Sequence, residues 1–161
     1  SSDLLDGFYT CAQGGETNRI ADINLFNRTI KNFDMLLYKE VNQLVQHNIL
    51  HICDYDGEYE GFEPRFQDYP GQIVNVPLKA DGKDLSLTKA AQIFQRPVMG
   101  GLDRHGVIST GTVDQVKKAT LELLKDAPAR LILSANCTVA SNTPIENLRT
   151  AIQTAHNYRQ G

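Results

Sequence analysis

The sequence predicts an α/β fold built on a parallel sheet, and three observations support this prediction. Short, almost continuously apolar runs alternate with amphipathic stretches along the 161 residues. Helix-start signals precede several of the amphipathic stretches. The chain has no internal repeat and no low-complexity tract. Strict alternation of strands and helices is typical of parallel sheets and barrels, because each helix returns the chain for the next parallel strand.

Five short apolar runs are the expected strands. Nearly continuous apolar runs suit parallel strands that are covered on both faces. We therefore expect strands at residues 7–12, 49–53, 72–76, 96–100 and 130–134.

The amphipathic stretches between these runs are the expected helices. The stretch from about residue 34 to residue 46 has leucine and valine side chains that share one helical face. Ser86 is placed to cap a shorter helix that ends near Phe94.

Two further helices begin with the sequence pattern of a capping box. In this pattern a Thr side chain caps the helix, and the residue three positions later returns the hydrogen bond. Thr112 pairs in this way with Gln115, and Thr143 with Glu146. We expect the last two helices of the chain to start at these positions.

The number of units leaves two architectures open. Five β/α units are enough for a doubly wound, flavodoxin-like sheet. They are also compatible with an incomplete (β/α)8 barrel, since a closed barrel typically needs about 250 residues. We expect residues 1–161 to form a single domain.

Composition excludes several classes of function. The net charge is −3 and Lys and Arg do not cluster, which argues against a nucleic-acid-binding protein. No apolar run approaches the roughly 20 residues of a membrane helix. The first ten residues have neither the charged nor the apolar region of a signal peptide. Three cysteines, an odd number, indicate reduced thiols, so we expect a cytoplasmic protein.

Three residues form a candidate zinc site. His51 and Cys53 are two apart on an expected strand, so their side chains point to the same face. Cys137 follows the last expected strand, again at a carboxyl end, where α/β folds place their sites. Imidazole and thiolate are ligands that zinc prefers, and three protein ligands leave a fourth position for a substrate. Zinc bound to a substrate thiol would make it a thiolate nucleophile.

A purely structural role for the same residues stays open. Cysteine is commonly buried as a small hydrophobe, and the spacing of these residues is by itself a weak signal. Cys11 also lies in an expected strand, and we assign it to packing.

Polar residues near other strand ends are candidate substrate-binding groups. Gln13 follows the first expected strand, Tyr55 and Asp56 follow the second, and Asp103 follows the fourth. The glycines at 100 and 101 lack the spacing of a nucleotide-binding loop, so we expect no nucleotide site there. No residue is assigned a catalytic role.

Four runs of the sequence are distinctive: residues 49–53 (ILHIC), 97–103 (PVMGGLD), 136–139 (NCTV) and 143–148 (TPIENL). They resemble the uroporphyrinogen decarboxylase superfamily, and within it the branch of methylcobalamin:coenzyme M methyltransferases. The resemblance covers nearly the whole chain. True uroporphyrinogen decarboxylases have a Gly-His-Gly segment where this chain has SANC at residues 134–137.

The resemblance implies that the chain is the C-terminal portion, about five β/α units, of a (β/α)8 TIM barrel. It also implies that His51, Cys53 and Cys137 are the zinc ligands of a methyltransferase-like protein. In that branch the metal activates a thiol that accepts a methyl group from a corrinoid such as methylcobalamin. A small-molecule thiol and a corrinoid protein are then the expected partners.

The family's barrels are about twice as long as this chain. The expected N-terminal strands, with their arginine-rich substrate motif and catalytic aspartate, have no counterpart here. Whether the chain is itself an enzyme is therefore left open. An incomplete barrel exposes apolar edges, so we expect self-association.

Two other functions remain alternatives. The first is a metal-free tetrapyrrole decarboxylase of porphyrin metabolism, for which Asp103 and Arg104 are the only evident candidate groups. The second is an inactive truncated barrel fragment. Metal analysis separates methyl transfer from decarboxylation, because a zinc ion bound to the protein would favour methyl transfer.

Overall fold

The computed structural model describes residues 5–12, 20–53 and 61–158. Five parallel strands within these ranges form one sheet, whose order β1-β2-β3-β6-β7 follows the chain. The strands are β1 (Tyr9–Ala12), β2 (Ile49–Ile52), β3 (Ile73–Asn75), β6 (Val98–Leu102) and β7 (Leu131–Ala135). The predicted parallel α/β sheet is confirmed, and each strand begins at or just after its expected position.

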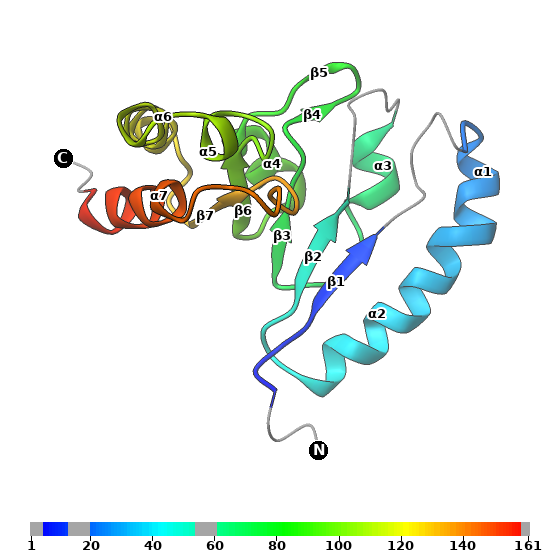
Figure 1. Cartoon of the computed structure of the whole chain (residues 1–161). Coiled ribbons are helices and arrows are strands. Elements are labelled where there is room, and N and C mark those ends of the chain that lie inside the picture. Colours follow the sequence, from blue (N-terminus) through cyan, green and yellow to red (C-terminus); the bar gives the residue numbers. More distant parts are fainter. Residues whose placement is uncertain (1–4, 13–19, 54–60, 159–161) are drawn as a thin grey trace.

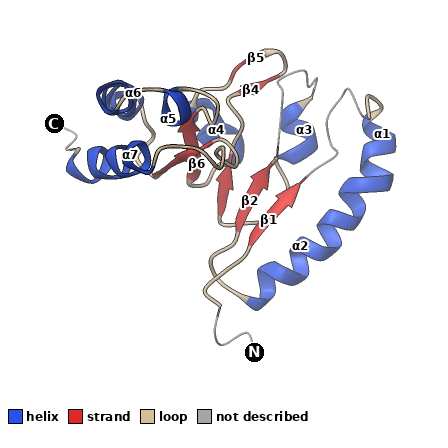
Figure 2. Ribbon diagram, in the orientation of Figure 1, coloured by secondary structure: helices blue, strands red, loops and turns tan. Residues whose placement is uncertain are grey.

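Helices alternate with these strands (Figures 1 and 2). A π-helical turn, Asn27–Lys31, joins the first two helices into one continuous segment. The helices are α1 (Ile23–Phe26), α2 (Asn32–Leu44), α3 (Phe62–Phe66), α4 (Leu87–Phe94), α5 (Val107–Thr110), α6 (Val113–Lys125) and α7 (Ile145–Asn157). Among the described residues, none of the helices has the length and apolar character that a membrane span requires.

The strand order decides between the two architectures that the sequence left open. A doubly wound sheet reverses its strand order at a switch point, with helices on both faces. Here every strand pairs with the next strand of the same sheet along the chain. Because crossovers between parallel strands share one hand, sequential order places all the helices on one face. The fold is therefore the arrangement of a partial (β/α)8 barrel.

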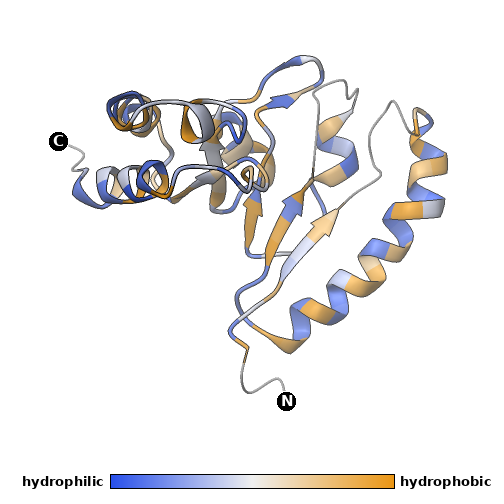
Figure 3. Ribbon diagram, in the orientation of Figure 1, coloured by the Kyte–Doolittle hydropathy of each residue, from blue (hydrophilic) through white to orange (hydrophobic). Residues whose placement is uncertain are grey.

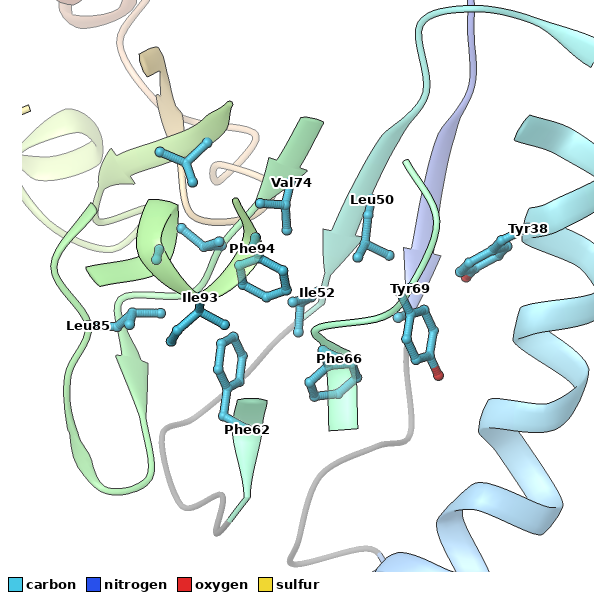
Figure 4. Packing of buried hydrophobic residues seen from close by; sticks show 14 of the residues in the cluster. Tyr38, Leu50, Ile52, Phe62, Phe66, Tyr69, Val74, Leu85, Ile93 and Phe94 are labelled. Atoms are coloured by element: carbon cyan, nitrogen blue, oxygen red, sulfur yellow. The ribbon is translucent and has the colours of Figure 1, made fainter. Parts of the chain in front are cut away.

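The helix-covered face of the sheet carries the apolar core (Figure 4). Leu50 and Ile52 of β2 and Val74 of β3 are almost completely buried there. Phe62 and Phe66 of α3 pack on them from the helix layer. Full burial of each such side chain contributes about 1.5–3 kcal/mol relative to exposure. This core fixes which strand residues must point to the opposite face.

Residues between these core positions point away from the helices. His51 lies between Leu50 and Ile52, and Asn75 follows Val74, and neither belongs to the apolar clusters. Side chains alternate across a strand, so His51 and Asn75 share the face opposite the helices. That face holds the candidate metal ligands.

Two expectations about helices are corrected. Leu36, Leu37 and Leu44 are exposed, and the buried residue of α2 is Tyr38. Figure 3 shows apolar stretches along the whole of α2. An apolar helical face ordinarily packs on the core, but this helix packs through the face that carries Tyr38 instead.

The second correction concerns the start of α7. No side chain caps this helix, whose N-cap position is Pro144. Thr143 Oγ1 instead lies 2.9 Å from Ser109 Oγ. The expected capping box at Thr143 is therefore wrong, although the helix itself is confirmed. At the start of α6, by contrast, Thr112 and Gln115 form both hydrogen bonds of the expected capping box.

A short hairpin that we did not predict lies between β3 and α4. Its antiparallel strands are β4 (Lys79–Ala80) and β5 (Lys83–Asp84). Asp81 and Gly82 join them with φ values of 51° and 71°. Positive φ at both central residues is the signature of a tight hairpin turn, for which Asp-Gly is a preferred sequence.

Candidate metal centre

The candidate ligands come together because neighbouring strands are in register. Cys11 of β1 pairs with His51 of β2, and His51 pairs with Asn75 of β3. In-register residues of parallel strands point to the same face. The Cys53 amide donates to Ala12 O at 3.0 Å and so extends the β1–β2 pairing to Cys53. One row of polar side chains therefore crosses three strands.

Cys137 reaches this row from the other end of the sheet. The preceding residue, Asn136, donates its backbone N–H to Leu102 O at 2.9 Å. Its side-chain Oδ1 accepts from the Arg104 amide at 2.9 Å. These two bonds hold the loop after β7 against the end of β6, and Cys137 extends from there toward His51.

The three predicted ligands meet at distances close to those around a tetrahedral zinc ion. Cys137 Sγ lies 3.5 Å from His51 Nε2 and 4.0 Å from Cys53 Sγ. Zinc bonds of about 2.3 Å to sulfur and 2.0 Å to nitrogen give ligand–ligand separations of about 3.5–3.8 Å. All three cysteines are free thiols. The donor set and its spacing therefore fit zinc.

Cys11 belongs to the same cluster, although we assigned it to packing. Its Sγ, a ring nitrogen of His51 and Cys53 Sγ all lie within 4.8 Å of one another. Its in-register pairing with His51 brings it there. The sequence places Cys11 in a strand but does not show how that strand pairs with the next. Without this register, no sequence signal indicated that Cys11 lies beside His51.

Asn75 fixes which ring nitrogen of His51 faces the thiols. The Asn75 Nδ2 group donates to Met99 O at 3.1 Å and to Ala135 O at 3.2 Å. Its Oδ1 is therefore turned toward His51 Nδ1, with which it forms a short hydrogen bond. An amide oxygen only accepts, so Nδ1 carries the proton and Nε2 presents a lone pair. A neutral imidazole whose Nε2 lone pair faces the thiols is a metal-binding form of histidine.

Tyr9 covers one side of the cluster. Its ring stacks on His51 with centroids 5.2 Å apart, and its hydroxyl donates to Asn75 Oδ1 at 2.9 Å. Burial, followed by the nearby thiols of Cys137, Cys11 and Cys53, raises the pKa of Tyr9 above its usual range. The hydroxyl thus stays protonated and remains a donor to Asn75.

The other predicted site residues fall outside this cluster or outside the described ranges. Asp103 lies in the turn after β6 with an exposed side chain, and its Oδ1 accepts from the His105 amide at 2.9 Å. Gln13, Tyr55 and Asp56 lie outside the described residues. Gly100 and Gly101 are residues of β6 itself and pair with β7.

Comparison with known proteins identifies the relatives of this chain. The family model for uroporphyrinogen decarboxylase (URO-D) matches residues 20–158. Among solved structures, a methyltransferase from Methanosarcina mazei superposes with a TM-score of 0.74 at 18% sequence identity. The match covers 95% of this chain and 42% of that one, so the chain spans less than half the length of this neighbour. A comparison with curated protein sequences finds no match.

Proposed function

Because the chain belongs to the uroporphyrinogen decarboxylase (URO-D) family, whose fold it shares with a methyltransferase, we propose a function in methyl transfer. It is a zinc-dependent, methyltransferase-like protein that acts between a corrinoid and a thiol. His51, Cys53 and Cys137 would hold the zinc ion. The observation that carries this proposal is the convergence of His51 Nε2 and Cys53 Sγ on Cys137 Sγ.

Each ligand has a defined part in this proposal. His51 binds through Nε2 while Asn75 keeps the proton on Nδ1. Cys53 and Cys137 contribute two thiolates, whose charge balances that of a divalent ion. Tyr9 stacks on the imidazole and limits its rotation. When bound, zinc supplies Lewis acidity that favours the thiolate form of a thiol substrate at neutral pH.

The reaction follows from a thiolate held at this site. Its sulfur attacks the methyl carbon of a methylated corrinoid, and a carbon–sulfur bond forms. The cobalt–carbon bond breaks with its electron pair left on cobalt, and the thiol proton goes to solvent. The products are a methyl thioether and a reduced corrinoid. The described residues contribute ligands and orientation, and the corrinoid supplies the methyl group.

An assay with methylcobalamin and a small thiol tests this proposal. We expect the zinc-loaded protein to accelerate loss of the methylcobalamin absorbance, with the methyl thioether formed in equal amount. Since the chain spans less than half of its structural neighbour, the assay is run on this chain and on any longer reading frame that contains it.

Two histidine variants make the assay specific for the cluster. His51→Ala removes a ligand, so its rate falls to that of the protein-free solution. His156→Ala changes an exposed histidine on α7 and keeps the wild-type rate. Equal rates for the two variants, or no acceleration by the zinc-loaded protein in either length, would overturn the proposal.

The metal-free alternative is decarboxylation of a tetrapyrrole, which the name of the matching family supports. It would need groups that bind carboxylates and polarise a pyrrole. Asp103, one of its two candidate groups, already accepts a hydrogen bond within its own turn. Loss of carboxyl groups from uroporphyrinogen, catalysed equally by wild type and His51→Ala, would favour this alternative.

A further inference from the structure

We propose that Cys11 is a fourth protein ligand of the centre and is the ligand that an external thiol displaces. This inference rests on the proposed zinc centre and adds a residue outside its His51, Cys53 and Cys137 set. It describes the substrate-free centre as three thiolates and one imidazole. The substrate class that follows is a thiol small enough to enter beside β1.

Position supports Cys11 as a ligand. Its Sγ, the His51 ring nitrogen and Cys53 Sγ form a group with all separations within 4.8 Å. Cys137 Sγ lies 3.5 Å from His51 Nε2 and 4.0 Å from Cys53 Sγ. Two overlapping triads thus share His51 and Cys53. Four donors of this kind are a complete tetrahedral set for zinc.

Burial indicates which of the four ligands exchanges. His51 is only 3% exposed and is held by Asn75. Cys53 and Cys137 are half-buried, whereas Cys11 is exposed. Cys11 also lies on β1, which is an end strand of the described sheet. An entering molecule therefore meets Cys11 first, and Cys11 is not a member of the apolar cluster that forms the core.

Charge favours a thiol as the molecule that enters. Three thiolates and a neutral imidazole give the zinc centre a net charge of about −1 by simple counting. Cys11 leaves as a thiol and carries away the proton of the incoming thiol, whose sulfur takes the vacated position. One sulfur–metal bond breaks and one forms, so charge and protons balance. A neutral oxygen or nitrogen ligand in place of Cys11 would change the charge of a partly buried site.

X-ray absorption at the zinc edge tests the ligand set directly. In zinc-loaded wild type we expect three sulfur neighbours and one nitrogen neighbour. Cys11→Ala should show two sulfurs and retain zinc, with its zinc affinity lowered. Addition of a small thiol to Cys11→Ala should restore the third sulfur. Addition to wild type should leave the sulfur count unchanged.

Alkylation of Cys11 follows the exchange without any assay of turnover. Zinc should protect Cys11 from iodoacetamide, as read by mass spectrometry of its peptide, and the small thiol should remove that protection. The role of Cys11 would be overturned if zinc had two sulfur neighbours in both wild type and Cys11→Ala, and if Cys11 of wild type were alkylated equally with and without zinc. That result would leave the proposed function standing. A wild type that binds no zinc would overturn this inference and the proposed function together.

Discussion

Asn75 is the residue on which the orientation of His51 depends. Its amide is fixed by two backbone carbonyls from β6 and β7, so only its oxygen faces the imidazole. Outer hydrogen-bond partners of this kind orient a metal-binding histidine and raise its basicity. The strand pairing of His51 with Asn75 makes this contact possible.

Removal of the Asn75 amide should weaken zinc binding without removing a ligand. We expect Asn75→Ala to lower zinc affinity by about 10–100-fold, measured by competition with a chelator. Its stability should fall as well, because the carbonyls of Met99 and Ala135 lose their donor. Asn157→Ala, on the exposed end of α7, is the matched control and should bind zinc as wild type does. A folded Asn75→Ala with wild-type affinity would contradict the role given to Asn75.

Asp34 makes the stability of the protein depend on pH. Its Oδ2 accepts from the buried Tyr69 hydroxyl at 2.9 Å. Burial raises the pKa of Asp34 above 3.8, and the bond from Tyr69 offsets this only in part. The folded state therefore holds the proton more tightly than the unfolded state. This contribution to stability is complete below the unfolded pKa and is lost as pH rises through the folded pKa.

Urea unfolding at a series of pH values isolates this contribution. Relative to Asp34→Asn, wild type should lose stability as pH rises from just below 3.8 to above the raised pKa. Other carboxyl groups titrate in both proteins, so the difference between the two curves reports Asp34. A difference that stays flat or grows in favour of wild type would show that the pKa is not raised.

Local signals predicted the helices better than the contacts these helices make. The Ser86 cap and the Thr112 capping box are confirmed, because each involves residues only three positions apart. The pattern at Thr143 failed because a side chain from α5, Ser109, offers Thr143 another partner. Likewise, the leucines of α2 gave the right helix but the wrong packing face.

The capping box of α6 should be measurable in stability. Thr112 Oγ1 accepts from the Gln115 amide at 3.3 Å, and Gln115 Oε1 accepts from the Thr112 amide at 2.8 Å. Thr112→Ala should lower the free energy of unfolding by about 1 kcal/mol. Lys117→Ala truncates an exposed side chain of the same helix and should change it by less than about 0.5 kcal/mol. Equal losses in both variants would mean that the cap contributes nothing specific.

Strands were predicted more completely than the site they carry. Apolar runs located all five strands of the main sheet, because such a run is a pattern that is local in sequence. The candidate ligand set depends on register between strands that lie far apart in the chain. His51 and Cys53 share one strand and were found together, but Cys11 needed the β1–β2 pairing to be recognised.

At the scale of the whole molecule, the sheet ends in two strands that pair on one side only within the described residues. These are β1 and β7, and side chains near them, such as Tyr9 and Ile132, are 52% and 40% exposed. Unpaired strand edges beside exposed apolar residues favour association with another chain. The parallel class followed from the sequence pattern, and the partial barrel implied by the family resemblance is confirmed by the strand order.

Self-association is the expected consequence. Sedimentation at tens of micromolar protein should show species larger than the monomer. Ile132→Lys places a charge on β7 and should shift the distribution toward monomer, because edge lysines oppose strand pairing. A clean monomer for wild type at these concentrations would contradict this expectation.

The zinc content of the reconstituted protein tests the metal centre most directly. After zinc loading and removal of excess metal, wild type should retain about one zinc ion per chain. Cys137→Ser and His51→Gln should retain almost none, whereas His47→Gln, which changes an exposed histidine beside β2, should match wild type. A wild-type protein that retains no zinc, or a His51→Gln variant that retains as much as His47→Gln, would contradict a centre built on His51, Cys53 and Cys137.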